Sequence, residues 1–332
     1  MALDIKTSGD KKYIIGEQPT FGTALADSIA GIELDCEPFS ITPDYKKREH
    51  PGSHAARWMQ GADMQTDNKG SAPTFTIAGP ARNSVDQFMY SIFQSVTEGI
   101  ATPWDKTFIW HATQPDFSVA TTGHQFTVWE DNGGADGWKA HSALVQGLTL
   151  SCQPGEFLNY SADMRALGTV AQNSDYTGTA VREQGNKWHF EDIDRFTIDF
   201  GGGAQTMVLM GFEVNLSQEI TPISPDGAGS FLTVALAKKR GTFSIEALFD
   251  ANTITGGTNI TTDTAITVNL GWGNAVPGTD DGDMDLTFKG KLENLEPTNN
   301  DTLSTTFTGD IVTTDATSPI TVVMANGLDR TW

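Results

Sequence analysis

The sequence predicts a mainly β protein with two tandem antiparallel β-sandwich or barrel domains and one amphipathic helix, at about 84–97, packed on the first. Three observations predict this fold. A strand-like phrase recurs along the chain, apolar and polar residues alternate over many segments, and one segment has helical periodicity. The 34 glycines among 332 residues are typical of many turns, and the 38% hydrophobic content is enough to bury a sizeable core.

The recurring phrase starts with glycine and reads GIELDCEP at 31–38 and GLTLSCQP at 147–154. Weaker copies read GFEVNLSQ at 211–218 and GKLENLEP at 290–297. In the first three copies, apolar residues follow the glycine by one, three and five positions, as a half-buried strand requires. The fourth copy departs from this pattern, because Glu293 occupies the third position.

A second repeat fixes the order of the first. TFTI at 74–77 matches TFSI at 242–245, and each lies between two glycine phrases. This order indicates a tandem duplication of one β-domain. We therefore predict a first domain over 1–172 and a second over 173–332, joined by a polar linker at 171–187.

The copies are not equally spaced, so one half must contain insertions. The offset is 143 from Gly147 to Gly290 but 180 from Gly31 to Gly211, which makes the first half 37 residues longer. The segment 44–70 has no long apolar run, and long segments of this kind are usually functional or disordered. One interpretation is a floppy hairpin, and the one we prefer is an arm that contacts another subunit or another ring.

The segment 44–70, which we call the arm, contains a basic cluster in an otherwise acidic half of the chain. A tryptophan and a methionine follow the cluster and give the arm an apolar contact point. Its contact candidates are Lys46, Lys47, Arg48, Arg57, Trp58 and Met59.

Other strands are predicted by alternation alone. Val208, Met210 and Phe212 begin a run that continues through 216, and a second run covers 266–272. Strands of this kind bury one face and expose the other, as antiparallel sandwiches and barrels require.

The predicted helix has apolar residues at helical spacing in SVDQFMYSIFQSV, after a capping box made by Ser84 and Gln87. We expect this apolar stripe to pack on a sheet rather than to recruit a partner. Its members are Val85, Phe88, Met89, Ile92, Phe93 and Val96.

The charge of the chain argues against general binding of nucleic acid. Its 42 acidic and 21 basic residues give a net charge of −21, whereas affinity for phosphate is built from clustered Lys and Arg. The N-terminal segment has no apolar stretch typical of a signal peptide, and the longest apolar run, at 207–212, is too short to span a bilayer. Cys36 and Cys152 take positions that are leucine in the other copies, so both are interpreted as small buried hydrophobes.

Searches for catalytic patterns find none in its proper context. Asp199, Phe200 and Gly201 spell a kinase metal-binding triplet, but no phosphate loop or catalytic loop accompanies them. His50 and His54 are separated by Pro-Gly, which prevents the helix that would aim both at one metal. We therefore predict no catalytic, cofactor-binding or metal site, and we expect that the protein is not an enzyme.

Several segments together resemble the major tail tube proteins of long-tailed bacteriophages. They are GEQPTFGTA at 16–24, the strand and helix of 74–96, HQFTVWED at 124–131, the strand pair of 145–168, and TSPITVVMANG at 317–327. The match is one of order and pattern, and it covers most of residues 14–170, with the second half similar to a degenerate copy.

This resemblance implies two domains of tail-tube type in a self-assembling structural protein of the virion tail, made in the host bacterial cytoplasm. Sheets join around an axis, and rings stack into a hollow tube that delivers the genome. Relatives with two tandem domains form trimers that mimic six-fold symmetry, which implies a homotrimer here, alternatively a hexamer. The implied partners are the chain itself, the tape measure, tail tip and tail terminator proteins, and double-stranded DNA that passes without specific binding, with no membrane involved.

Other classes of protein remain open at this stage. A phage adhesin or another virion surface protein with tandem β-domains would share the duplication, but it would bind a receptor and form no rings. A carbohydrate-active enzyme would need a buried carboxylate pair, and a capsid-decoration protein would bind heads rather than itself.

Overall fold

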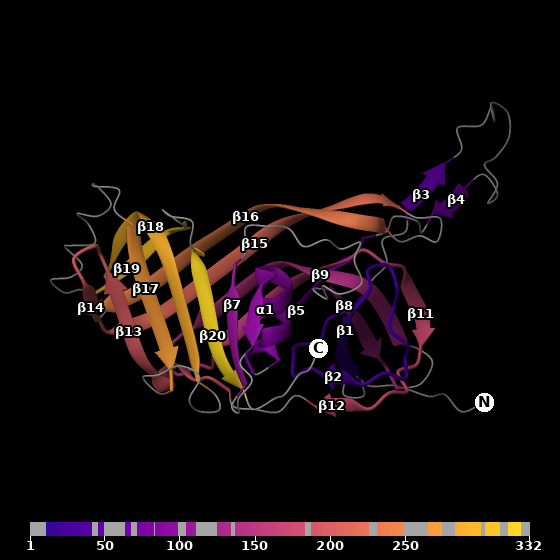
Figure 1. Ribbon diagram of the computed structural model, residues 1–332, viewed down its shortest axis with the longest axis horizontal. Coiled ribbons are helices and arrows are strands. Elements are labelled where there is room, and N and C mark those ends of the chain that lie inside the picture. The colour runs from indigo at the N-terminus through magenta and orange to yellow at the C-terminus, as the bar shows by residue number, and fades with distance from the viewer. Residues whose placement is uncertain are drawn as a thin grey trace.

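The computed structural model describes most of the chain, as Figure 1 shows. The described residues are 11–41, 46–49, 64–67, 72–82, 84–98, 104–110, 125–133, 137–182, 187–225, 231–248, 265–273, 283–299, 303–312 and 318–326. The contact candidates Arg57, Trp58 and Met59, and the pair His50 and His54, lie outside these ranges.

The protein is mainly β with one α-helix in the described residues, as the sequence predicts. The first half contains β1 (Lys12–Gln18), β2 (Gly31–Glu33), β3 (Lys46–Glu49), β4 (Met64–Asp67), β5 (Thr74–Pro80), α1 (Val85–Phe93), β6 (Val96–Glu98), β7 (Trp104–Ile109), β8 (Gln125–Asp131), β9 (Gly137–Cys152), β10 (Asn159–Ala166), β11 (Val170–Ser174) and β12 (Ala180–Arg182). The second half contains β13 (Ile193–Asp199), β14 (Ala204–Thr206), β15 (Leu209–Pro225), β16 (Phe231–Leu248), β17 (Ala265–Trp272), β18 (Met284–Asn299), β19 (Leu303–Ile311) and β20 (Ile320–Asn326).

The two halves have the same strand order. In the first half, hydrogen-bonded neighbours run β1, β8, β9, β10 and β5, and in the second half they run β13, β17, β18, β19 and β16. In addition, β11 pairs with β9 as β20 pairs with β18. Six strands of one half therefore have counterparts in the other, while a domain boundary at residue 172 stays a prediction.

The strand that holds GKLENLEP is the counterpart of the strand that holds GLTLSCQP, but the two phrases are not in register. In the pairing of β9 with β10, Gln146 is the extra residue of a bulge, and in the pairing of β18 with β19 that residue is Glu293. Matching the two bulges gives an offset of 147 residues between β9 and β18, whereas matching Gly147 with Gly290 gives 143. The difference of four leaves each side chain on the same face of the sheet, because the side-chain period of a strand is two.

The halves are joined into one sheet at two places. β9 pairs with β15 from Gly147 opposite Ser217 to Cys152 opposite Phe212. The last strand, β20, pairs with β7 of the first half. In the described part of the chain, every strand except β3 and β4 belongs to this sheet.

The predicted linker at 171–187 is in large part built into the first half. β11 pairs with β9, and β12 pairs in parallel with β2. Between them, the ring of Tyr176 meets Trp129 edge-on with centroids 5.2 Å apart, and its hydroxyl donates to the carbonyl of Ile29. The polar composition of 171–187 does not predict this contact with the first half, because the backbone of β11 and β12 and the ring of Tyr176 make it.

Helix α1 is shorter than predicted at its C-terminal end. Gln94 has φ 63°, in the left-handed region, and its N–H donates to the carbonyl of Tyr90 as a helix cap. Val96 therefore lies in β6, where it packs against the core as a half-buried residue. The predicted capping box is wrong, because the side chain of Ser84 makes no capping bond and its carbonyl accepts from Gln87 instead.

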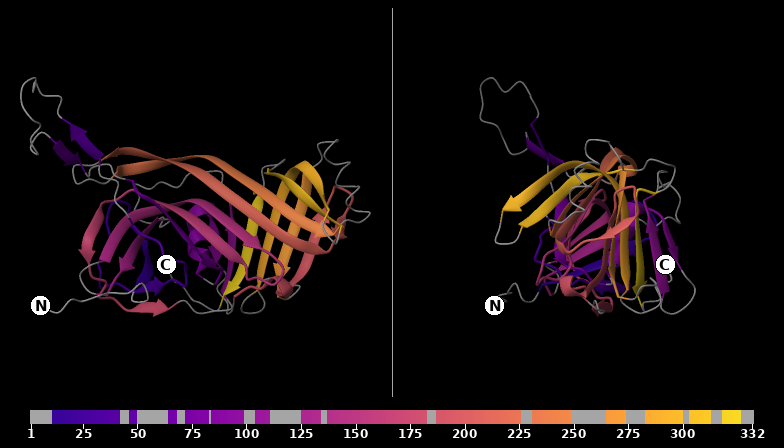
Figure 2. Two further views of the ribbon diagram at one scale, coloured as in Figure 1. Left: turned by 180° about the vertical axis from the view of Figure 1, so that it is seen from behind. Right: turned by 90° about the vertical axis from the view of Figure 1, so that its left-hand side faces the viewer.

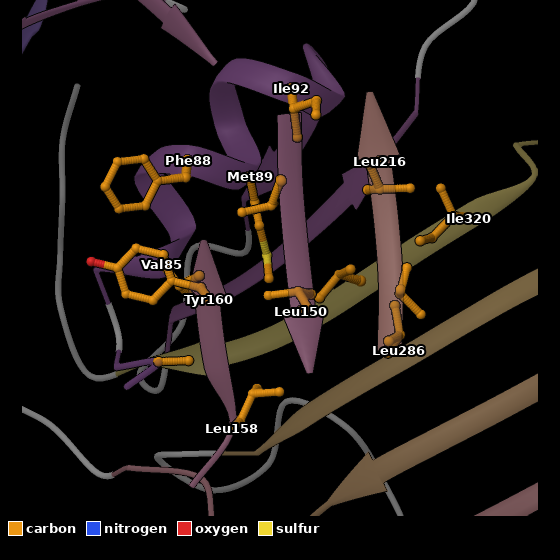
Figure 3. Packing of buried hydrophobic residues seen from close by; sticks show 14 of the residues in the cluster. Val85, Phe88, Met89, Ile92, Leu150, Leu158, Tyr160, Leu216, Leu286 and Ile320 are labelled. Carbon is orange, nitrogen blue, oxygen red and sulfur yellow. The ribbon is translucent and has the colours of Figure 1, made fainter. Parts of the chain in front are cut away.

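The apolar stripe of α1 lies against the sheet, as Figure 3 shows. Its members Val85, Phe88, Met89, Ile92 and Phe93 are at most 1% exposed. The ring of Phe88 stacks on Tyr160 of β10, with centroids 5.1 Å apart. The helix thus covers the apolar side of the sheet and leaves the other side open.

Candidate functional surface

The strands near the joint between the halves have one apolar side and one polar side. In β15, Phe212, Val214 and Leu216 are at most 1% exposed, whereas the alternating Glu213 and Asn215 are exposed. The same alternation occurs in β5, β10, β9, β16 and β19, which lie next to one another in the sheet with β15. Together they form a continuous surface over both halves.

We call this surface the polar face and define it by two rows of paired residues that cross six strands. One row is Ala78, Ser161, Thr149, Asn215, Thr242 and Asp310. The neighbouring row is Pro80, Asn159, Ser151, Glu213, Ser244 and Thr308. None of these residues is buried.

The chemistry of the polar face is that of small hydroxyls and amides. The two rows contain two carboxylates and no Lys or Arg. At their border, Arg240 lies 3.1 Å from Asp310, and the Thr76 hydroxyl donates to Asp163 at 2.7 Å. The face is therefore hydrophilic. Arg240 and Lys238, which lie beside the rows, are each paired with a carboxylate, and the first row continues past Asp310 to Lys291 of β18.

A hollow of about 620 Å³ lies over the joint itself. Gln146 and Asp163 line it from the first half, and Ser217, Glu219 and Arg240 line it from the second. Its walls are polar from both sides, so the joint of the two halves is open to water on the polar face.

A second hollow, of about 370 Å³, lies on β13, β17 and β18. Within it, Arg195 Nη2 lies 2.6 Å from Asp285 Oδ1. The pKa of Asp285 is nevertheless raised from its ordinary value, because burial of the carboxyl outweighs the attraction of Arg195.

On the other side of the joint, a buried polar cluster connects four elements, β15, β9, the end of α1 and β16. Gln218, at a bulge in β15, donates from Nε2 to the carbonyl of Val145 at 2.7 Å. Gln94, at the end of α1, donates to Gln218 Oε1 at 3.1 Å and accepts from Lys239 Nζ at 3.2 Å. Burial lowers the pKa of Lys239 to about 8.

Beyond this cluster, the far half of the β15–β16 hairpin lies across the first half of the chain, as Figures 1 and 2 show. Ile220 and Val234 pack with Leu144 and Leu167 in a small separate core. Arg165 donates to the carbonyl of Ile220 at 2.9 Å. The joint between the halves thus combines strand pairing, a polar cluster and an apolar clamp.

The basic contact candidates are not on the polar face. Lys46, Lys47 and Arg48 lie in β3, which pairs with β4 from Lys46 opposite Asp67 to Glu49 opposite Met64. Figure 1 shows that this two-stranded hairpin projects away from the rest of the molecule. β3 and β4 thus form a two-stranded sheet that is separate from the joined sheet, and the role of the arm as a contact stays a prediction.

Neither Cys36 nor Cys152 forms a disulfide. Cys152 is fully buried on the apolar side, and burial raises the pKa of its thiol to about 12. Cys36 is half-buried and packs against the same core. Cys152 fits the interpretation as a small buried hydrophobe, and Cys36 fits it in part.

No family model matches the chain, and no curated protein matches its sequence. Among the described residues, no helix is long and apolar enough to cross a membrane. In the same ranges, no group of three or more His, Cys, Asp or Glu side chains is arranged to hold a metal ion. We therefore infer function from the fold and from the polar face.

Sequence reasoning finds the strands but misses the polar face. Ser and Thr between apolar residues, as in TFTI and TFSI, mark the outward positions of single strands. The pairing of β9 with β15 turns these isolated positions into rows, and no periodicity within either strand predicts that pairing.

Proposed function

We propose that this protein is the subunit of the hollow tail tube of a long-tailed bacteriophage, through which genomic DNA reaches the host. The observation that carries the proposal is the polar face, an uninterrupted sheet surface that crosses both halves of the chain. A sheet that continues from one half to the next is the unit from which a closed ring is built, and closure removes exposed sheet edges.

The chemistry of the polar face suits a passage for DNA. Phosphates bind where Lys and Arg gather, and the two rows contain neither. Hydroxyls and amides keep the surface wet, and the exposed Glu213 repels the phosphate backbone, while Asp310 is paired with Arg240. With this face towards the lumen, DNA slides without forming salt bridges to the wall.

The shared strand order of the halves supports a ring of three chains. Each chain supplies two similar units in one sheet, so three chains supply six. Helix α1, which is buried on the opposite side of the sheet, then lies away from the lumen. A ring of six chains is the alternative.

Electron microscopy of the purified protein, together with its native mass, tests the proposal. We expect trimers that stack into hollow tubes, spontaneously or after seeding with tail-tip complexes. Hexameric rings would keep the function and overturn the trimer. A chain that remains monomeric even when seeded would contradict the proposal and favour an adhesin.

Labelling tests which face lines the lumen. Asn215→Cys places a thiol on the polar face, and Val208→Cys places one at a site that is 57% exposed outside the two rows. A bulky polymer-linked maleimide should label both variants before assembly, and only Val208→Cys in finished tubes. Equal labelling of Asn215→Cys in tubes would contradict a lumenal polar face.

A further inference from the structure

We propose that a second copy of this chain pairs with β18 past Lys291, and that it does so with its segment Phe39–Ile41. This inference rests on the proposed self-assembly and specifies which surfaces meet. Its basis is a contact already present within the chain, the joint between β9 and β15, together with the counterparts of both strands in the other half.

In the first half, β10 pairs with one edge of β9, and two strands in succession, β8 and then β15, pair with the other edge. Ala143 pairs with Phe126 of β8 on one side and with β10 on the other. Further along, Leu148 pairs with Leu216 of β15 on one side, again with β10 on the other. β15 therefore continues the line of β8.

In the second half, β18 is arranged in the same way up to one point. Gly290 pairs with Ile266 of β17 on one side and with Ile311 of β19 on the other. β17 starts at Ala265, opposite Lys291, while β19 continues along its own side to Asn299. Past Lys291, no strand of the described ranges pairs with β18 on the β17 side. This is the position that β15 fills on β9.

The counterpart of β15 in the first half is the chain that precedes β5. Phe39 lies against Phe75 of TFTI, with ring centroids 5.5 Å apart and planes within 6°. Phe243, the matching residue of TFSI, is paired with Val214 of β15. The ring of Phe39 thus lies beside Phe75, as Val214 lies beside Phe243, while the Glu37 N–H donates to the carbonyl of Ala78 at 2.7 Å.

The register of the arm agrees with this correspondence. Lys46 is paired with Asp67, and Thr221 is paired with Ala235. Lys46 follows Phe39 by seven residues, as Thr221 follows Val214, and Asp67 precedes Phe75 by eight residues, as Ala235 precedes Phe243. β3 and β4 are therefore the counterparts of the far part of the β15–β16 hairpin, and what distinguishes the arm is its longer tip.

The correspondence predicts the register of the contact. In the chain, Asn215 pairs with Thr149. The counterpart of Asn215 is Ser40, and the offset of 147 makes Glu296 the counterpart of Thr149. Ser40 and Glu296 are both exposed, as residues on the polar face should be. We therefore expect Ser40 of one copy opposite Glu296 of the next.

The arm follows from the same geometry. The far part of β15–β16 lies on the first half, over Leu144 and Leu167. Its counterpart, the β3–β4 hairpin, should lie in the same way on the second half of the neighbouring copy. The arm is then a contact between neighbouring chains of one ring. Around the ring, the joint of β9 with β15 within each chain alternates with the joint of β18 with Phe39–Ile41 between chains.

Cross-linking between copies tests the pairing. The single variants Ser40→Cys and Glu296→Cys are mixed in equal amounts, assembled, checked for tubes by microscopy and oxidised. We expect covalent dimers made of one copy of each variant. Neither variant alone, nor Ser40→Cys mixed with Glu213→Cys on the internal joint, should yield such dimers.

The outcomes separate this inference from the proposed function. Tubes without the mixed dimer would overturn the pairing and leave the tube assignment standing. Failure of the unaltered protein to assemble, even when seeded, would overturn both.

Hydrogen exchange on the unaltered protein gives a second test that no substitution can disturb. Amides of β18 past Lys291 that point to the β17 side should exchange at least about tenfold more slowly in tubes than in free chains, because the new strand pairing protects them, whereas those that point to β19 are already paired. Amides of β9 at 147–152, paired within the chain, should be protected in both states. Unchanged exchange past Lys291 in tubes would overturn the pairing.

Discussion

Lys106 Nζ lies 2.9 Å from Asp86 Oδ2, and both side chains are almost completely buried, with exposed fractions of 3% and 1%. Lys106 comes from β7 and Asp86 from the first turn of α1. The pair fixes the helix to the strand that receives β20 from the other half. A buried ion pair adds little stability by itself, but removal of one partner leaves an uncompensated charge.

Lys106→Met should therefore lower the free energy of unfolding by about 3–5 kcal/mol, measured by urea denaturation. Adding Asp86→Leu should recover most of the loss, because no charge then remains buried. The exposed pair of Lys238 and Glu219, at 2.8 Å, provides the control, and Lys238→Met should leave the urea midpoint unchanged. An unaffected Lys106→Met protein would mean that Asp86 is solvated.

Gln218→Leu should weaken the joint of the halves. The substitution keeps the volume but leaves the Val145 carbonyl and the Gln94 amide without their bonds, which costs about 1–3 kcal/mol for each buried group. Ser217→Ala, at the exposed neighbouring position, should change stability by no more than about 0.5 kcal/mol. Equal urea midpoints for the two variants would show that water replaces the lost bonds.

Lys239 should make folding more stable as the pH rises through about 8. Burial lowers the folded pKa to about 8, whereas the unfolded lysine keeps its ordinary value of 10.5. Between these values the unfolded chain binds the extra proton, so the free energy of unfolding increases with pH. Urea midpoints at pH 7 to 10 should rise less for Lys239→Met than for wild type, while Lys238→Met should follow wild type. Parallel curves for Lys239→Met and wild type would refute a depressed pKa.

Gly309→Ala should destabilise the second half by about 1–3 kcal/mol, because the added methyl group would fall on the Lys291 carbonyl oxygen and the ring of Phe243. The matched control is Gly202→Ala, where a methyl group meets nothing within 4 Å. Thermal unfolding distinguishes the two variants. A lower melting temperature for Gly202→Ala than for Gly309→Ala would contradict this packing.

Simultaneous change of Lys46, Lys47 and Arg48 to Glu should weaken assembly, because each acidic chain would then meet acidic arms. The effect should be larger at low salt, where charges are poorly screened. Tube yield measured by light scattering over a range of salt concentrations provides the test. Equal assembly of mutant and wild type at every salt concentration would show that the charge of the arm does not contribute to assembly. Deletion of 44–70 would then test whether the shape of the arm contributes.

Local sequence patterns predict the elements well where packing agrees with them. The run at 266–272 is β17, with Ile266, Val268, Leu270 and Trp272 at most 1% exposed. The run from Val208 is displaced at its start, because a bulge between Leu209 and Gly211 buries Leu209 and leaves Val208 exposed. A bulge depends on pairing with the neighbouring strand, so the sequence of one strand alone does not predict it.

Long-range pairing is what the sequence does not reveal. The β15–β16 hairpin, with strands of 17 and 18 residues, looks from its sequence like two ordinary strands and a turn. Its length matters because its near part completes β9 and its far part clamps the first half. The duplication is visible in short phrases, yet the correct offset in the second pair of strands comes from bulges rather than from the glycines.

The pairing of β9 with β15 has a consequence for how an assembly responds to dilution. Both strands belong to one chain, so this joint has an effective concentration set by covalent connection and forms at any protein concentration. In a ring of three chains, half of the joints would exist before two molecules meet, and each chain would offer one acceptor edge and one donor segment. Growth would then be directional, since every incoming molecule has a head and a tail.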